Sequence, residues 1–166
     1  MIVPAALGDL VKPWADAYSN SKLLATVVTF VHVAGLLFGG GLAVAADRGT
    51  LRAMRRDAGL RGSHLEELSA VHRVVLTGLT LSLISGLLLL AADLDTYFGS
   101  WIFWTKMGMV ALLLANGYLM TRTERMLKAS PDPESTAWGK LHRASIVSLA
   151  LWFAITLAGV ALVNAA

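Results

Sequence analysis

The chain has 166 residues, of which 56% are hydrophobic and only 15% are charged, and its formal net charge is +3. A soluble domain of this length carries about 25% charged residues and lacks the core volume to bury so much apolar surface. The composition therefore excludes an ordinary soluble domain and a disordered chain. Because there is no cysteine, a disulfide scaffold, a thiolate metal site and a cysteine nucleophile are excluded as well. The sequence predicts a membrane protein.

Residues 1–22 form a polar segment before the first apolar stretch. Prolines and aspartates interrupt it at Pro4, Asp9, Pro13 and Asp16, so it lacks the continuous apolar region of a cleavable signal peptide. We expect this segment to lie at the outer membrane surface, with a short interfacial helix over residues 13–18.

Four apolar stretches follow, at residues 23–46, 74–92, 101–120 and 144–166. Each approaches or exceeds the roughly 20 residues with which a helix crosses about 30 Å of hydrocarbon. We therefore predict one all-α domain over residues 23–166, an integral membrane four-helix bundle with antiparallel helices. None of the four stretches contains Asp or Glu, so we expect no pair of carboxylates for acid–base chemistry inside the bundle.

The basic residues divide unevenly between the two ends of the predicted bundle. Of the 14 lysines and arginines, six lie between the first two stretches and five between the last two, which together makes eleven. Because basic loops stay in the cytoplasm, we predict an N-out, C-out protein of the bacterial cytoplasmic (inner) membrane, with both long loops inside. These charges belong to loops beside a membrane, and no nucleic-acid partner is predicted. The eleven are Arg48, Arg52, Arg55, Arg56, Arg61, Arg73, Arg122, Arg125, Lys128, Lys140 and Arg143.

Two His-Arg pairs lie at matched depth near the predicted cytoplasmic ends of the second and fourth helices, at His72-Arg73 and His142-Arg143. Facing imidazoles can ligate the iron of a b-type haem, and arginines can hold its propionates. Histidine and arginine are equally typical of the lipid headgroup zone. A proton relay or a metal site is a third interpretation, although a two-histidine metal site lacks further strong ligands here.

A second polar layer lies in the outer half of the predicted bundle. His32 follows Leu23 by nine residues, which places it about 13 Å below the outer edge, and Lys106 lies about 8 Å deep. A histidine at that depth needs a partner or a function. Three roles are open for His32: a structural hydrogen bond, ligation of haem iron, or proton transfer. Lys106 can extend its stem to the outer surface or contact a propionate, another ligand or a substrate.

Small residues accompany His32 along its helical face. Gly35 and Gly39 lie three and seven residues further on, where they either admit a flat porphyrin or pack against a neighbouring helix in a small-xxx-small motif. The same two interpretations apply to Gly78, Ser82 and Gly86 in the second stretch.

Motifs in the first three stretches resemble a known group of proteins. The first carries Phe30-Val-His32-Val-Ala-Gly35, then Gly39-Gly-Gly41 and Asp47-Arg48, the second Leu81-Ser-Leu-Ile-Ser85-Gly86 and the third Phe103-Trp-Thr-Lys106-Met107. Over residues 20–120 this pattern resembles small bacterial four-helix membrane proteins, among them the copper-resistance protein D-like group and the oxygen-independent protoporphyrinogen oxidase group. The resemblance implies haem binding, with His32 and Lys106 at positions that the oxidase group associates with haem and activity.

We therefore expect a haem b-binding membrane protein that transfers electrons, alone or with a redox partner. Its candidate iron ligands are His32, His72 and His142, and Lys106, Arg73 and Arg143 are further candidate haem contacts. Two other functions stay open: a non-catalytic accessory subunit, whose glycine faces dock other membrane subunits, and a small transporter. The lack of cysteine and of methionine pairs near His32 argues against soft copper ligation. No enzymatic reaction is assigned.

Overall fold

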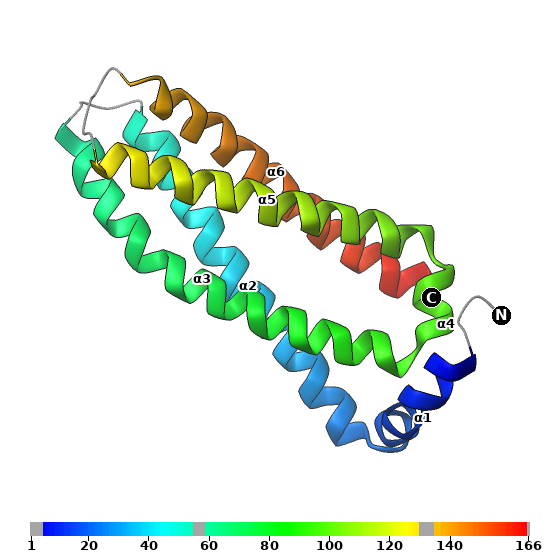
Figure 1. The fold of residues 1–166 in the computed structure, drawn as a ribbon. Helices are drawn as coiled ribbons and strands as arrows, with labels where there is room; N and C mark the ends of the chain where they lie inside the picture. Colours follow the sequence, from blue (N-terminus) through cyan, green and yellow to red (C-terminus); the bar gives the residue numbers. More distant parts are fainter. Residues whose placement is uncertain (1–4, 55–58, 130–134, 166) are drawn as a thin grey trace.

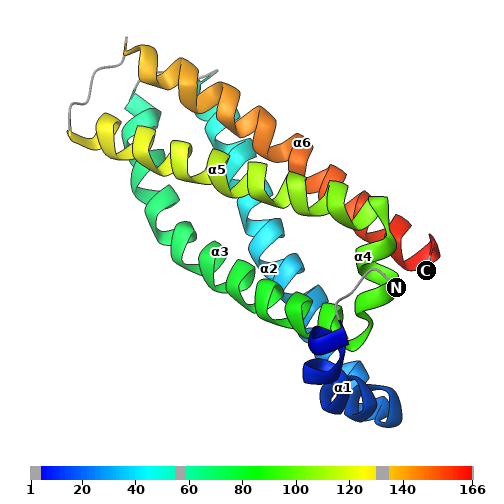
Figure 2. The same ribbon diagram turned by 45° about the vertical axis from the view of Figure 1, so that its right-hand side comes forward.

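The computed structural model of the chain describes residues 5–54, 59–129 and 135–165. Within these ranges the chain is all-α, as predicted, and forms six helices (Figure 1). Two views show α1 and α4 at the end of the molecule opposite to the C-terminal ends of α2 and α5 (Figure 2). The helices are α1 (Ala5–Asn20), α2 (Lys22–Met54), α3 (Gly59–Ala92), α4 (Leu94–Gly99), α5 (Trp101–Ala129) and α6 (Thr136–Ala165).

Four of these helices, α2, α3, α5 and α6, are long and apolar enough to cross a membrane. Large apolar side chains point outward from them: Phe30, Phe153 and Leu157 are 69–70% exposed. An outer surface of this kind is stable in contact with lipid, and helices satisfy their backbone hydrogen bonds internally there. The lipid bilayer is thus the environment that these helices require.

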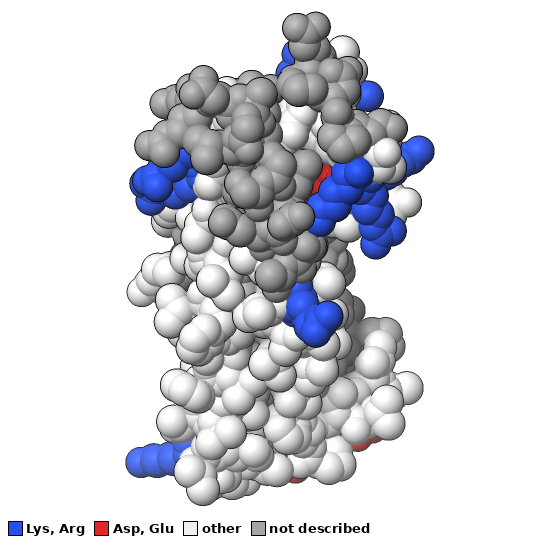
Figure 3. Space-filling view, turned by 90° about the vertical axis from the view of Figure 1, so that its left-hand side faces the viewer, with Lys and Arg blue, Asp and Glu red and all other residues white. Residues whose placement is uncertain are grey.

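All four helices continue beyond their apolar stretches at one end of the bundle. The last residue of α2 is Met54 and that of α5 is Ala129, while α3 and α6 begin at Gly59 and Thr136. On the face drawn in Figure 3, most Lys and Arg side chains gather at this end, above a broad band without charge. Hydropathy alone does not reveal these polar extensions, because it marks only the apolar part of a helix.

The first helix, α1, is longer than the predicted six-residue segment and contains Pro13 within it. The indole Nε1 of Trp14 donates a hydrogen bond to the carbonyl oxygen of Leu88 at 2.8 Å. This contact attaches α1 to the end of α3.

Helices α2 and α3 touch backbone to backbone. A Cβ atom on Gly35 would lie 2.8 Å from the carbonyl oxygen of Gly78, and a Cβ on Gly78 would lie 2.7 Å from the Cα of Gly39. Both distances are shorter than van der Waals contact, so only glycine fits at these crossings. The glycines therefore serve helix packing, and the backbone of α3 fills the space that a porphyrin would need beside them.

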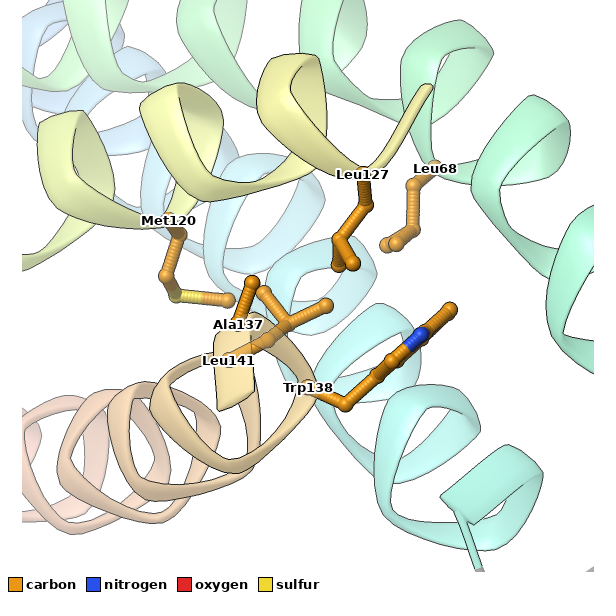
Figure 4. Close-up of a cluster of buried hydrophobic side chains, with 6 residues drawn as sticks. All are labelled: Leu68, Met120, Leu127, Ala137, Trp138 and Leu141. Atoms are coloured by element: carbon orange, nitrogen blue, oxygen red, sulfur yellow. The ribbon is translucent and has the colours of Figure 1, made fainter. Parts of the chain in front are cut away.

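Helix α6 joins the α2–α3 pair to α5. It packs against α5 and, less extensively, against α2. At the contact with α2, the ring of Trp152 lies over Gly40, 2.9 Å from the point where a Cβ on Gly40 would be. The Asn116 side chain on α5 donates a hydrogen bond to the carbonyl oxygen of Ala144 on α6 at 2.9 Å. At the basic end, six buried apolar side chains close the bundle (Figure 4): Leu68, Met120, Leu127, Ala137, Trp138 and Leu141.

The contact between α2 and α3 gives the first testable prediction. We expect Gly78→Ala to destabilise the bundle by about 1–3 kcal/mol, because the added methyl group meets backbone atoms that cannot move aside. Gly41→Ala on α2 is the matched control, because a Cβ there meets nothing within 4 Å. Thermal unfolding of the purified protein in detergent measures both variants, and equal melting temperatures would contradict the packing role.

Candidate functional site

Polar side chains from all four long helices converge at the basic end of the bundle. We call them the inner cluster: Asp47 from α2, His72 from α3, Glu124 from α5, and Ser145 and Ser148 from α6. Asp47 is 2% exposed, Glu124 4%, Ser145 0% and Ser148 5%. Groups of this polarity are rarely so deeply buried without a partner or a function.

The expectation that no pair of carboxylates lies inside the bundle is wrong. Asp47 and Glu124 follow the apolar stretches that end at residues 46 and 120, but α2 and α5 continue through them. Asp47 therefore shares a face with Gly40 and Ala43, seven and four residues before it, and this face points inward. The two carboxylates lie near enough to each other to interact electrostatically.

His72 links α3 to α5. Its Nε2 lies 2.9 Å from the hydroxyl oxygen of Thr121, and its Nδ1 lies 3.1 Å from the carbonyl oxygen of Leu68. The same Nδ1 is 3.6 Å from Glu124 Oε2. The imidazole is 31% exposed, whereas the Glu124 side chain is 5% exposed, so His72 reaches the surface of the bundle beside the buried acid.

A cavity of about 90 Å³ lies between the four helices, and Asp47, His72, Glu124 and Ser148 contribute its polar wall. The hydroxyl groups of Ser145 and Ser148 lie beside the Asp47 carboxyl group and interact with it, but Asp47 Oδ2 and Glu124 Oε1 have no hydrogen-bond partner among the described residues. A buried polar atom without a partner costs about 1–3 kcal/mol. A water molecule or a ligand in the cavity would satisfy these oxygens.

The two predicted His-Arg pairs do not form a single site in the described part of the chain. His72 directs both ring nitrogens to α3 and α5, and it lines the cavity whereas His142 does not. His142 on α6 is half-buried and forms no hydrogen bond or ion pair with a described residue. Arg73 and Arg143 are exposed, as is usual for arginines beside lipid headgroups.

His32 occupies a separate position in the other half of the bundle. Its Nδ1 lies 2.9 Å from the carbonyl oxygen of Ser82 and 3.3 Å from Ser85 Oγ. The Ser85 hydroxyl donates its own hydrogen to Leu81 at 2.6 Å. A carbonyl can only accept, so Nδ1 carries the hydrogen and Nε2, which has no partner among the described residues, keeps its lone pair.

Lys106 belongs to the same outer layer. It is half-buried on α5, and its Nζ lies 3.5 Å from the point where a Cβ on Gly159 of α6 would be. Its charge acts on His32, although it forms no ion pair with a described residue. The absence of a side chain on Gly159 thus leaves room for a cation inside the bundle.

Among the residues that the structure describes, neither layer has the donor set of a bare metal ion. In the described ranges, no three His, Asp or Glu side chains converge as metal ligands. A haem differs from a bare ion because the porphyrin supplies four of the iron ligands and the protein needs to supply only one or two.

Sequence reasoning missed Asp47, Glu124, Thr121, Ser145 and Ser148 as site residues. The available signal was helical periodicity beyond the apolar stretch: Glu124 lies four residues after Met120, on the face that α5 turns to its neighbours. No such signal relates the serines of α6 to α2, because contacts between these helices depend on how they pack.

Comparisons with protein-family models, with curated proteins and with solved structures find no match. The architecture alone defines the class of the protein, an all-helical bundle of four candidate membrane spans with two separate polar layers.

The geometry of His32 gives the second prediction. We expect its neutral imidazole to be the tautomer with hydrogen on Nδ1, because Ser82 offers only an acceptor. Nitrogen-15 NMR of histidine-labelled protein in bicelles distinguishes the two tautomers, and His32→Ala assigns the signals. A hydrogen on Nε2 instead of Nδ1 would contradict the observed contact.

Proposed function

We propose that the four long helices cross the bacterial cytoplasmic membrane in antiparallel order, with both basic loops in the cytoplasm and both chain ends outside. Two observations support this topology. Eleven of the 14 basic residues lie in or beside the two long connections. The C-terminal ends of α2 and α5 lie at the same end of the molecule as the first turns of α3 and α6 in both views (Figures 1 and 2).

The third prediction tests this topology with reporter fusions. The fusion point after residue 166 should lie outside the cytoplasm, and an insertion point within residues 130–134 should lie inside, because basic loops resist translocation. A pair of alkaline phosphatase and green fluorescent protein fusions measures both positions. Reversed activities would place the inner cluster at the outer surface.

We propose further that the chain binds haem b through His32 and serves electron transfer. The observation that carries this proposal is the hydrogen bond from His32 Nδ1 to the Ser82 carbonyl oxygen at 2.9 Å. Histidines that ligate metals typically donate their other ring hydrogen to such a group, which fixes the tautomer and directs the lone pair at the metal. The resemblance of residues 20–120 to haem-associated four-helix proteins points to the same residue.

The two polar layers differ in the groups that they offer to the iron and the propionates of a haem. At the inner cluster both ring nitrogens of His72 are engaged in contacts with α3 and α5. In the outer layer His32 has a free lone pair and Lys106 offers a cation for a propionate. A bound haem would supply a one-electron iron couple, which a redox partner would reduce or oxidise.

One alternative, a small transporter or other ion-handling protein, is favoured by the buried carboxylates of the inner cluster. The other alternative, a non-catalytic accessory subunit, has weaker support. Gly35, Gly39 and Gly78 are already in contact within the chain, so they are not available to dock other membrane subunits.

The fourth prediction concerns the visible spectrum of the detergent-purified protein before and after dithionite. We expect a Soret band that His32→Ala abolishes and Lys106→Ala shifts, because one substitution removes the iron ligand and the other a propionate contact. His72→Ala and His142→Ala are the matched controls and should leave the spectrum unchanged. A colourless, fully folded wild-type protein would overturn haem binding and favour an accessory subunit.

A further inference from the structure

The charges of the inner cluster do not balance within the described part of the chain. Asp47 and Glu124 are both buried, and among the described residues neither forms an ion pair with Lys or Arg. Among the described residues, His72 from α3 lies 3.6 Å from Glu124 Oε2, and Lys128 acts on Glu124 from an exposed position one turn along α5. Two buried carboxylates with one imidazolium leave a net negative charge, which a low-dielectric interior does not tolerate.

The unpartnered atoms of the cluster point to what restores the balance. Asp47 Oδ2 and Glu124 Oε1 are each inaccessible and unpaired within the described structure, and both residues line the 90 Å³ cavity. A polar cavity of this size has room for water molecules that would bridge these oxygens. A metal ion would need several ligand atoms around one point, and the described residues offer no such group.

The hydrogen bonds of His72 allow a proton to enter and leave. Thr121 Oγ1 lies 3.0 Å from the carbonyl oxygen of Gly117 and 2.9 Å from His72 Nε2. When the Thr121 hydroxyl donates to the Gly117 carbonyl oxygen, His72 Nε2 must donate to the hydroxyl oxygen. Because Nδ1 also donates, to the Leu68 carbonyl oxygen, both ring nitrogens then carry hydrogen and the ring is an imidazolium. When the ring loses one hydrogen, the hydroxyl can turn and donate to Nε2. The two arrangements differ by a single proton.

An apolar layer separates the inner cluster from His32. It is built around Leu113, Trp152 and Ile155, with Leu36 and Leu79 packed against it. Among the described polar residues that line the cavity, His72 is the one that reaches the surface. Within the described structure, the polar route from the surface to the carboxylates therefore runs through His72.

We infer that the inner cluster is a proton-binding site, in which Asp47 and Glu124 share one exchangeable proton through water in the cavity and His72 relays it. The site stands on the cavity and the unpartnered carboxylate oxygens. It is independent of haem, so a colourless protein would leave it intact.

The fifth prediction is made for infrared spectra of the full chain in detergent, in neutral H2O and D2O buffers. The wild type should show the C=O stretch of a protonated carboxylic acid, and this band should shift in D2O because the proton exchanges. Asp47→Asn and Glu124→Gln should each abolish the band. Each amide removes one negative charge, and His72 then balances the carboxylate that remains. Asp16→Asn on the exposed face of α1 is the matched control and should keep the band.

His72→Gln tests the relay by itself. The band should stay, because the cation is lost and the carboxylates still share their proton, but its shift in D2O should be slower since glutamine cannot pass a proton on. A shift as fast as that of the wild type would overturn the relay through His72.

Three outcomes would overturn the binding site. They are the absence of the band from the folded wild type, its survival in both amide variants, and its loss on addition of sodium chloride but not choline chloride. The last result would identify sodium ion as the ligand. The wild-type spectrum does not depend on any variant, and if one amide variant fails to fold, the other still assigns the band.

Discussion

The backbone contact between α2 and α3 is the constraint on which both polar layers depend. Gly35, Gly39 and Gly78 let the two helix axes approach until main-chain atoms touch. His32 precedes Gly35 by one turn and Ser82 follows Gly78 by one turn, so this approach brings His32 Nδ1 to the Ser82 carbonyl oxygen. With larger side chains at the crossing, the imidazole would lie deep in the bilayer without its acceptor, at a cost that membrane interiors rarely allow.

The bundle keeps its two polar layers apart, and the separation has an electrostatic consequence. The ring of Trp152 fills the notch at Gly40 and completes the apolar layer between His32 and the inner cluster. Charge in one layer is therefore not compensated by groups of the other, and each layer must satisfy its polar atoms locally. His32 does so with serine oxygens. The inner cluster retains unpartnered carboxylate oxygens, which is why a bound proton is inferred there.

The sequence predicts features that depend on one continuous stretch of chain better than contacts between residues far apart in the chain. Four long apolar helices are recognisable because lipid requires a continuous apolar run, and the depth of His32 follows from helical rise alone. Its partner Ser82 lies 50 residues away, and only the register of α2 on α3 decides that they meet. Asp47 and Glu124 were missed for a different reason. A hydropathy limit ends a span at the first charged residues, whereas burial follows the helical face, which continues to Asp47 in α2 and to Glu124 in α5.

The order of helix packing explains why His72, and not His142, occupies the inner site. Helix α2 packs against both α3 and α6, and α6 packs against α5, so α3 and α5 are the two ends of this series. Where they face each other, the polar links in the described part of the chain are the contacts of His72 with Thr121 and Glu124. A proton gained or lost at His72 therefore changes the hydrogen bonds between α3 and α5, beside the cavity that both helices line. His142 lies on α6 and forms no hydrogen bond or ion pair with a described residue, so a proton there would alter no such link between helices in the described part of the chain.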